Sequence, residues 1–339
     1  LDASWQADLW GRVGAGVEAA RSDLDASEAD LAAAQLSVAA QTAIAWINLN
    51  EAVAQEQVAV QTLDSRVRTK DITERRFARG VADALEVRTA RSAIASAEAA
   101  IASRQQFTGN AVRSLEVLAG RYPANALEAP AVLPQLDPIV PISSPMDILA
   151  RRPDISASEA RVVSAGLRAE QARLALLPSL QLTASLSSSD TDLADAFDPQ
   201  RIAARAIAGL TAPLFNGGSL AADRDAALSR ARGSAWSEVE DALAADAFLA
   251  RQEDAQLVAL DEAIEAEDLA TRQYTNGLIT IFNLIDAQNR RLSSESNLIS
   301  ARSARASNRI RYHLALGGGV PVAPAATDVS PQTPCNHRR

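Results

Sequence analysis

The chain has 339 residues, of which 47% are hydrophobic and only 4% are aromatic. Its net charge of −9 offers no basic surface to a nucleic acid, which argues against that class of partner. One cysteine, Cys335, and two histidines, His313 and His337, are too few for an internal disulfide or a histidine-rich metal site. The sequence has no Gly-rich phosphate loop, nucleophile elbow or metal-ligand cluster, so we expect neither an enzyme nor a cofactor.

Residues 1–10 carry the pattern of a strand. Apolar and polar residues alternate strictly from Leu1 to Leu9. A period of two predicts a strand with one apolar and one polar face. The first residues do not resemble a signal peptide and lack an initiator Met, so we interpret the chain as a fragment of a longer protein.

Residues 11–120 are predicted to form a first, very long helical hairpin. No proline occurs before Pro123, and proline is excluded from helix interiors. A helix from about Arg12 to Ala78 would be roughly 100 Å long, and Gly80 then separates it from a returning helix. Apolar residues recur every seven positions, as in coiled coils. They are Val17, Leu24, Leu31, Val38, Val87, Ile94, Ile101 and Leu115.

Residues 121–152 read as a Pro-rich connector, after which the helical pattern returns. Pro153 fits the first turn of a helix over 153–178. Two strands joined by a loop are predicted over 179–216. Alternation is regular from Leu180 to Leu186 and weaker from Ala206 to Leu214.

Residues 217–318 are predicted to form a second long hairpin, and residues 319–339 a disordered tail. The second hairpin repeats the first. Gly80 corresponds to Gly277, and Gly120 corresponds to Gly317, both at an offset of 197 positions. A constant offset at two separate landmarks indicates an internal duplication.

The three predicted strands do not belong in a simple coiled coil. A sheet packed on a soluble core would give the same alternation, but the chain offers little else to cover such a sheet. Apolar outside and polar inside is also the pattern of a membrane β-barrel strand, and such a barrel has to be closed. Three strands cannot close, so several chains would have to share the barrel.

Motifs in the same order as in one known family extend over nearly the whole chain. They are Trp5…Val13, Leu149–Ile155, Leu177–Leu180, Pro213–Leu220, Tyr274…Leu278 and Leu314–Gly319. Together they resemble the TolC-like outer-membrane factors, especially the OprM/NodT-type lipoprotein branch. The fold class expected from residues and resemblance is mainly α with a small β part. Duplicated, coiled-coil-like helical hairpins would be rooted in short strands of a trimeric transmembrane β-barrel.

The resemblance implies the exit duct of a tripartite efflux system, which carries drugs or other small molecules out of the periplasm without covalent chemistry. The duct would be a homotrimer in the lipid of a Gram-negative outer membrane, extending into the periplasm. Its partners would be a periplasmic adaptor and an inner-membrane transporter. The family has a further strand before the point where this chain begins, so we expect three barrel strands here. Cys335 is in the wrong place for the family's lipid anchor.

Two sets of site residues are transferred from the family by motif. The contacts to the adaptor would be Arg79, Gly80, Val81, Asn276, Gly277 and Leu278, at the two hairpin tips. The glycines alone are also explained by the ends of two helices. The pore gate would be Asp286, with Asn283 at a second family acidic position and Glu86 at the matching place in the first copy. A trimer would arrange Asp286 as a ring of three carboxylates, which favours cations. Each of these residues could also be an ordinary solvated charge on a helix.

Two alternatives stay open at this point. A type I secretion duct shares all of these features. A soluble coiled-coil scaffold explains the helices and the duplication, but not the three alternating strands at the roots of the hairpins.

Overall fold

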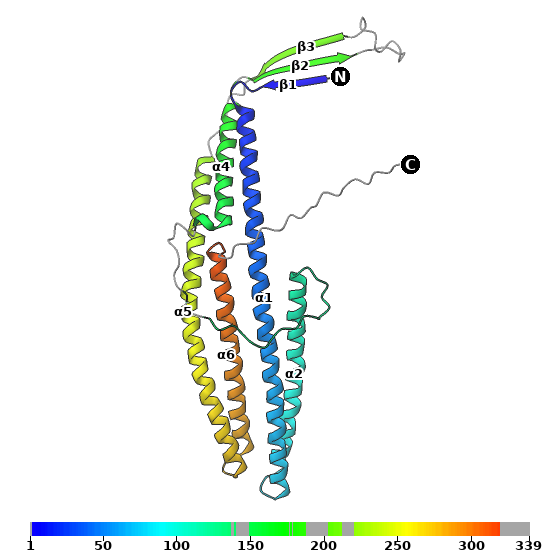
Figure 1. The fold of residues 1–339 in the computed structure, drawn as a ribbon, viewed down its shortest axis with the longest axis vertical. Coiled ribbons are helices and arrows are strands. Elements are labelled where there is room, and N and C mark those ends of the chain that lie inside the picture. Colours follow the sequence, from blue (N-terminus) through cyan, green and yellow to red (C-terminus); the bar gives the residue numbers. More distant parts are fainter. Residues whose placement is uncertain are drawn as a thin grey trace, which may run out of the picture.

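The computed structural model describes residues 2–136, 139, 149–175, 177, 179–187, 203–211 and 220–318. The molecule is elongated, with a small sheet at one end and the turns of two helical hairpins at the other (Figure 1). The predicted tail over 319–339, which contains Cys335, lies outside the described residues. The elements in chain order are β1 (Asp2–Ala7), α1 (Arg12–Ala78), α2 (Ala84–Leu118), α4 (Pro153–Leu174), β2 (Ser179–Ser187), β3 (Ala203–Thr211), α5 (Leu220–Thr275) and α6 (Ile281–Ala315).

Helix α1 has 67 residues and the bounds predicted from the proline and glycine pattern. It begins after Gly11, whose φ of +79° is a conformation that favours glycine. The side chain of Asp8 accepts hydrogen bonds from the backbone N–H groups of Val13 (3.0 Å) and Gly14 (2.9 Å). These bonds satisfy donors that the start of a helix otherwise leaves without partners.

Helices α1 and α2 form hairpin 1, and helices α5 and α6 form hairpin 2. The ends of α1 and α5, Ala78 and Thr275, differ by 197 positions. The starts of α2 and α6 differ by the same number, 281 against 84, and so do their ends, 315 against 118. The duplication inferred from two pairs of glycines therefore extends to the bounds of the helices.

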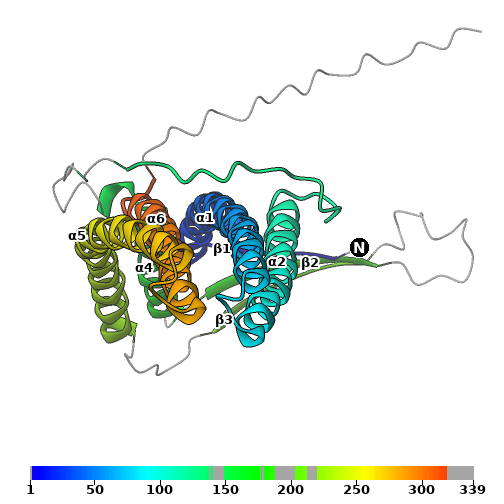
Figure 2. The same cartoon turned by 90° about the horizontal axis from the view of Figure 1, so that it is seen from below.

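Seen from below, the hairpin helices lie in an arc in the order α5, α6, α1 and α2 (Figure 2). Helix α1 packs against α2, α6 and α4, whereas α5 packs against α6 and α4. Among the described helices, α2 and α5 therefore form the two open edges of the arc. None of the helices that the structure describes is long and apolar enough to cross a membrane.

Coiled-coil packing would bury the seven-residue pattern of the first half of α1 in a seam within the chain. In the structure this pattern is not buried. Val17, Leu24, Leu31 and Val38 are all exposed. Helix α4 packs on another side of α1, where Asp23 accepts a hydrogen bond from Ser164 over 2.6 Å. The buried residues of α1 in this region are alanines, whose small side chains let two helix axes approach closely.

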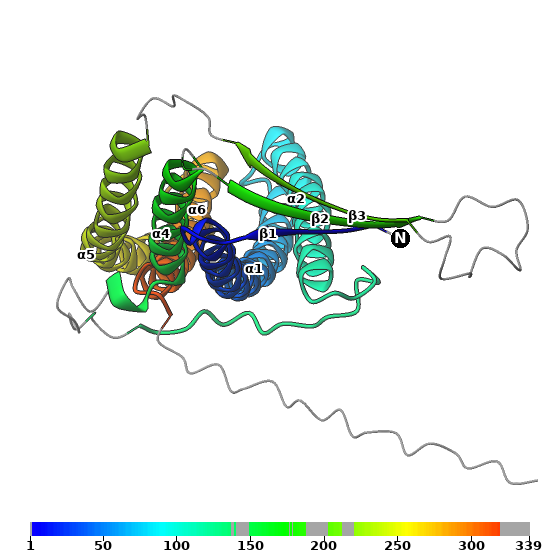
Figure 3. The ribbon, with the colours of Figure 1, turned by 90° about the horizontal axis from the view of Figure 1, so that it is seen from above.

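The sheet has the order β1-β2-β3, and both pairs of strands are antiparallel. Trp5 lies opposite Leu182 in the first pair, and Leu182 lies opposite Ala208 in the second. From above, the three strands run side by side and extend to one side of the helices (Figure 3). The third strand begins at Ala203, three residues before the predicted alternation, which starts at Ala206. It spans Ala203–Thr211, and Leu214 lies outside the described residues.

Arg152 joins three elements in the middle of the molecule. Its buried guanidinium makes ion pairs with Asp154 (2.6 Å) and with Glu238 of α5 (2.8 Å). It also donates to the backbone oxygen of Ala315, at the end of α6, over 3.1 Å. The hydrogen bond to Asp154 is the main cause that raises the pKa of Arg152. Next to it, Gly317 has a φ of +83°, and a Cβ there would lie 2.8 Å from the carbonyl oxygen of Arg151.

The connector after hairpin 1 is irregular over 121–136, and residues 149–151 add a helical turn within the predicted connector. Glu116, buried near the end of α2, holds the first part of the connector in place. The carboxylate accepts hydrogen bonds from the backbone N–H groups of Asn125 (2.8 Å) and Ala126 (2.7 Å). The bond from Ala126 is the main cause that lowers the pKa of Glu116.

Candidate functional site at the hairpin tips

Each hairpin ends in a tight turn centred on glycine. The φ angles are +75° at Gly80 and +78° at Gly277. In both copies the N–H groups of the glycine and the next residue donate to carbonyls in the last helical turn, which is a Schellman arrangement. These bonds are Gly80 to Phe77 (2.9 Å), Val81 to Arg76 (3.0 Å), Gly277 to Tyr274 (3.0 Å) and Leu278 to Gln273 (2.9 Å). Closing a helix in this way accounts for a glycine at both positions.

Apolar side chains are exposed at matching positions of the two tips. Val81 is 62% exposed, and Leu278, 197 positions later, is 74% exposed. Leu85 and Phe282 form a second exposed pair at the same offset. Arg79 and Asn276 are exposed beside them. The tips therefore present two similar apolar surfaces that no described part of the chain covers.

The two tips differ at one equivalent pair, Phe77 and Tyr274. Phe77 is exposed, whereas Tyr274 is fully buried between the hairpins. The phenol oxygen of Tyr274 donates to Oε2 of Glu86 over 2.9 Å and lies 2.9 Å from the hydroxyl of Thr73. The ring packs in a cluster with Ala90 from α2 and Ile281 from α6. This side chain of hairpin 2 therefore bonds to both helices of hairpin 1.

Arg76 adds to the same contact. Its guanidinium carbon lies 4.4 Å from the centre of the Tyr274 ring, within the range of a cation–π interaction. The Nη1 atom donates to the backbone oxygen of Tyr274, and Nη2 donates to the backbone oxygen of Val81 over 3.3 Å. We call Thr73, Arg76, Glu86 and Tyr274 the tip contact.

Burial is the main cause that raises the pKa of Tyr274 to about 12, and the carboxylate of Glu86 acts in the same direction. The phenol therefore stays protonated at physiological pH. A protonated phenol can donate a hydrogen bond to a carboxylate, and repulsion between two anions does not arise.

The structure separates the three predicted gate residues. Asp286 is exposed on α6 and makes an ion pair with Arg290, one turn later, over 2.9 Å. Asn283 is also exposed, and its side-chain oxygen accepts a hydrogen bond from Thr280 over 2.8 Å. Glu86 is partly buried in the tip contact. Of these three residues, Asp286 and Asn283 therefore take no part in the tip contact.

The profile of the family described as "Outer membrane efflux protein" matches residues 1–121 and 145–318. The chain belongs to the outer membrane efflux protein family. The cation efflux system protein CusC of Escherichia coli (strain K12) is 29% identical, covering 94% of this chain and 72% of CusC. The pyoverdine export outer membrane protein OpmQ of Pseudomonas aeruginosa is 32% identical, covering 94% of this chain and 69% of OpmQ.

Solved structures of outer-membrane channels have the same fold. The outer-membrane channel OprN matches with a TM-score of 0.82 at 25% identity, covering 94% of this chain and 74% of OprN. The open state of the Neisseria gonorrhoeae MtrE outer membrane channel matches with a TM-score of 0.76 at 30% identity, covering 94% of this chain and 74% of MtrE.

This outer membrane efflux protein is thus an exit duct of a tripartite efflux system, in the outer membrane of a Gram-negative bacterium and reaching into the periplasm. Its family consists of transport channels, which work with partner proteins in pumps. The alternative of a soluble coiled-coil scaffold is wrong for a member of this family.

Sequence reasoning missed the tip contact, apart from Glu86. In the sequence, Tyr274 stands out only as part of a family motif, and no motif singles out Thr73 or Arg76 as a site residue. The available signal was the pair Phe77 and Tyr274, two aromatic residues at equivalent positions that differ by one hydroxyl. A buried hydroxyl needs a hydrogen-bond partner, so this difference marks the copy in which the ring turns inward.

Proposed function

We propose that three copies of this outer membrane efflux protein form one duct and that its tips bind a periplasmic adaptor. Small molecules delivered by an inner-membrane transporter would leave the cell through the duct. Relatives are named for cations, pyoverdine, antibiotics and toluene, all of them small solutes. A duct of this kind passes what its transporter delivers.

The observation that carries adaptor binding is the repeated exposed apolar surface at the tips. Val81 and Leu85 on one tip match Leu278 and Phe282 on the other. Exposed apolar side chains that gather in one place mark sites of protein association. Two similar tips per chain would offer an adaptor two similar sites.

The open edges of the helical arc support a ring of several copies. Residues 53–110 of hairpin 1 contain nine Lys or Arg and seven Asp or Glu, whereas the equivalent range of hairpin 2, 250–307, contains six and nine. These two ranges carry net charges of +2 and −3, and within them the edge helix α2 (84–110) carries +1 and the edge helix α5 (250–275) carries −5. Opposite charges on the two edges favour an arrangement in which α5 of one copy lies beside α2 of the next.

The acidic edge is formed by α5. Asp254, Asp261, Glu262 and Glu265 are exposed there and make no ion pair with any residue that the structure describes.

In a ring, copies related by rotation about the long axis of the duct would keep each residue at the same height along that axis. Thr108 of α2 bonds to Glu56 of α1 over 2.8 Å, so Arg104, one turn nearer the tip, is near the level of residue 60 of α1. Ser65 of α1 bonds to Glu267 of α5 over 3.2 Å, so residue 60 is near the level of Asp261. Arg104 of one copy would therefore lie near the level of Asp261 of the next.

The strands support a membrane barrel shared by the copies. Trp5 and Leu182 lie opposite one another in the register and are both exposed, 64% and 42%. A sheet face with exposed apolar side chains is suited to contact with the lipid of a membrane. In the described sheet, β1 and β3 each have one unpaired edge, and an edge in lipid must be paired. Neighbouring copies would supply the missing partners.

Asp286 is the residue we propose for the gate. Its exposure and its place six residues after Thr280 put it just above the tip of hairpin 2. Three copies would bring three such carboxylates to one level, where they attract cations and repel one another. Asn283 adds no charge there, and we assign Glu86 to the tip contact.

Substitution of the tip glycines tests the proposal. We expect Gly80→Trp or Gly277→Trp to abolish dye efflux from cells that supply the adaptor and the transporter, while trimers still appear on unheated gels. Gly120→Trp is the matched control, because Gly120 has a φ of +68° and, like Gly80, no atom within 4 Å of an added Cβ. Gly120 lies at the other end of hairpin 1. Normal efflux with both tip substitutions would contradict adaptor binding at the tips.

A further inference from the structure

Phe248 stands on the open edge of α5 and faces away from its own hairpin. It follows Asp246 by two positions, which is about 200° around a helix. Asp246 is buried and lies 3.5 Å from Arg309 of α6. Phe248 is 64% exposed, and the guanidinium carbon of Arg251 lies 4.8 Å from the centre of its ring. The ring is therefore held by Arg251 on one face and is open to a neighbouring chain elsewhere.

Val117 and Tyr122 form an exposed apolar surface on the other open edge, at the end of α2 that is farthest from the tip. Val117 follows Leu115 by two positions, and Leu115 is buried in a cluster with Leu49 of α1. Val117 therefore faces away from α1, and it is 60% exposed. Tyr122 comes just after the turn at Gly120 and is 85% exposed. We call Val117 and Tyr122 the upper apolar edge of hairpin 1.

Contacts between the two hairpins give the height of Phe248 relative to α1. Thr73 of α1 contacts Tyr274 of α5, 201 positions later, and Ser65 of α1 contacts Glu267 of α5, 202 positions later. The two helices run in the same direction, from the sheet toward the tips. Phe248 therefore lies level with residue 46 or 47 of α1.

The same height on α2 is occupied by Val117. Helices α1 and α2 are antiparallel, and Thr108 bonds to Glu56 over 2.8 Å. Residues 46 and 47 lie ten and nine positions before Glu56, so they are level with the residues ten and nine positions after Thr108, which are 118 and 117. Rotation about the duct axis would keep this height and would bring Phe248 of one copy to Val117 of the next.

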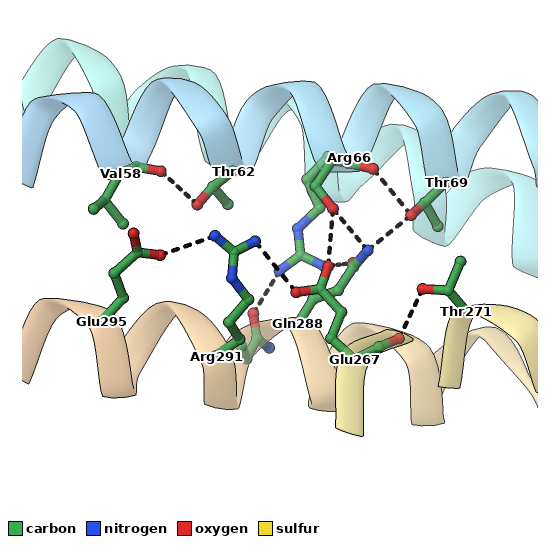
Figure 4. A network of polar contacts seen from close by, with 11 residues as sticks. Val58, Thr62, Arg66, Thr69, Glu267, Thr271, Gln288, Arg291 and Glu295 are labelled. Atoms are coloured by element: carbon green, nitrogen blue, oxygen red, sulfur yellow. Dashed lines mark hydrogen bonds and ion pairs between the residues drawn. The ribbon is translucent and has the colours of Figure 1, made fainter. Parts of the chain in front are cut away.

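The seam between α1 and α6 inside the chain has a different chemistry. It is polar, because Ser300 donates to Glu51 over 2.8 Å and the side chains of Arg66 and Gln288 meet nearer the tips (Figure 4). Glu51 is the equivalent of Phe248, 197 positions earlier. An aromatic ring in place of a carboxylate adapts the open edge of α5 to an apolar partner.

The two seams would also differ in register. Equivalent residues of the hairpins are 197 positions apart, whereas residues at one height are 201 or 202 apart. Hairpin 2 therefore stands four or five residues, about 6–7 Å, farther from the tip end than hairpin 1, and its turn is the higher one in Figure 1. A ring has to reverse this step between one copy and the next. A contact that repeated the internal seam would instead place Phe248 beside Ser103, the equivalent of Ser300.

The charges around these residues favour a second copy of the chain as the partner. Range 250–275 of α5 carries −5 and range 84–110 of α2 carries +1, so the two open edges attract one another. Complementary charges guide an encounter, whereas aromatic residues at an interface carry a large share of the binding energy. Phe248 and the upper apolar edge are the features that can set the register.

We propose that Phe248 of one copy packs against Val117 and Tyr122 of the next, and that this contact fixes the register of the three chains. Arg251 stays on the other face of the ring, where its charge remains in water. The inference rests on the proposed function, in which three copies form one duct, and adds the contact that sets their relative height.

Paired cysteines test the register, in a Cys335→Ser background so that each pair supplies the only thiols. The first pair is Phe248→Cys with Val117→Cys, and the second is Phe248→Cys with Ser103→Cys. Ser103 is 14 residues, about 21 Å, from Val117 along α2. A disulfide needs Cα atoms less than about 7 Å apart, so the two pairs cannot both form in one register. Each chain carries one cysteine on each open edge, and bridging therefore joins the copies covalently.

We expect covalent dimers and trimers on denaturing gels from the first pair, after mild oxidation of detergent-extracted protein, and none from the second. Bridging of the second pair alone would overturn the register and leave the trimer in place. Trimers on unheated gels that neither pair can bridge would overturn the contact at Phe248. Absence of trimers from unheated gels of the unmodified protein would contradict the proposed function, and the inference with it.

Truncation of the ring gives a second measurement that needs no bridge. Phe248→Ala should lower the temperature at which trimers dissociate on gels, whereas Phe248→Leu, which keeps a large apolar side chain, should retain most of it. Phe282→Ala is the matched control, because Phe282 is 54% exposed but lies at the tip of hairpin 2. Equal dissociation temperatures of Phe248→Ala and Phe282→Ala would overturn the proposed contact.

Discussion

The phenol oxygen of Tyr274 on α5 donates a hydrogen bond over 2.9 Å to the carboxylate of Glu86 on α2. The two residues stand 188 positions apart and belong to different copies of the duplicated hairpin. Their bond holds the two hairpins of one chain together at the tips, the end that we assign to the adaptor. The contact is therefore placed where a binding partner could change it.

Removal of the Tyr274 hydroxyl is expected to weaken this closure. Tyr274→Phe leaves Glu86 and Thr73 without the hydroxyl, which costs about 1–3 kcal/mol for partly buried groups. We expect a higher basal conductance in planar bilayers at unchanged trimer yield. Phe77→Tyr, at the equivalent exposed position, is the control and should leave conductance unchanged. Equal conductance of Tyr274→Phe and the unmodified protein would count against a closing role.

The raised pKa of Tyr274 predicts a loss of stability at alkaline pH. The folded pKa is about 12 and the ordinary value is 10.0. Between these values the folded state binds more protons than the unfolded state, so stability falls as pH rises. The stabilisation is complete below pH 10 and declines toward pH 12. Denaturant titrations across this range should show a steeper decline for the unmodified protein than for Tyr274→Phe, and parallel curves would refute the assignment.

The helix bounds and the duplication could be predicted from the sequence because they depend on local rules. Proline is absent from both hairpins, and a glycine with positive φ ends each descending helix. Burial could not be predicted, because it depends on which helices meet. Val17 and Leu24 follow a coiled-coil period but face away from α4, and Arg66 reads as a solvated charge yet lies inside the seam. Tyr274 turns inward only because hairpin 1 stands next to it.

Asp286 is expected to limit the pore. Asp286→Ala removes one carboxylate per chain, so single-channel conductance should rise and the preference for cations should fall. Asp268→Ala on α5 is the matched control, because Asp268 makes an ion pair with Arg272 of the same i,i+4 type and similar exposure. The control should leave conductance as it is. Identical conductance and selectivity of Asp286→Ala and the unmodified protein would exclude Asp286 from the gate.

Charge reversal is expected to weaken the contact between copies. Asp261→Arg places a positive charge near the level of Arg104 of the next copy, which should lower the temperature at which trimers dissociate on gels. Exposed pairs contribute at most about 1 kcal/mol each, so the shift should be small and largest at low salt. Adding Arg104→Glu to Asp261→Arg should restore the original temperature. A double variant that is less stable than either single variant would show that the two residues do not face each other.

Photo-crosslinking in living cells tests the central claim, adaptor binding at the tips, most directly. A photoreactive amino acid is placed at Val81 or at Leu278, and the same residue at Phe107, exposed on α2 away from the turn, is the reference. Adducts are identified by mass spectrometry from cells that contain the adaptor and the transporter. The account predicts an adduct with the periplasmic adaptor from both tip positions and none from Phe107. The absence of adaptor adducts from both tips would contradict it.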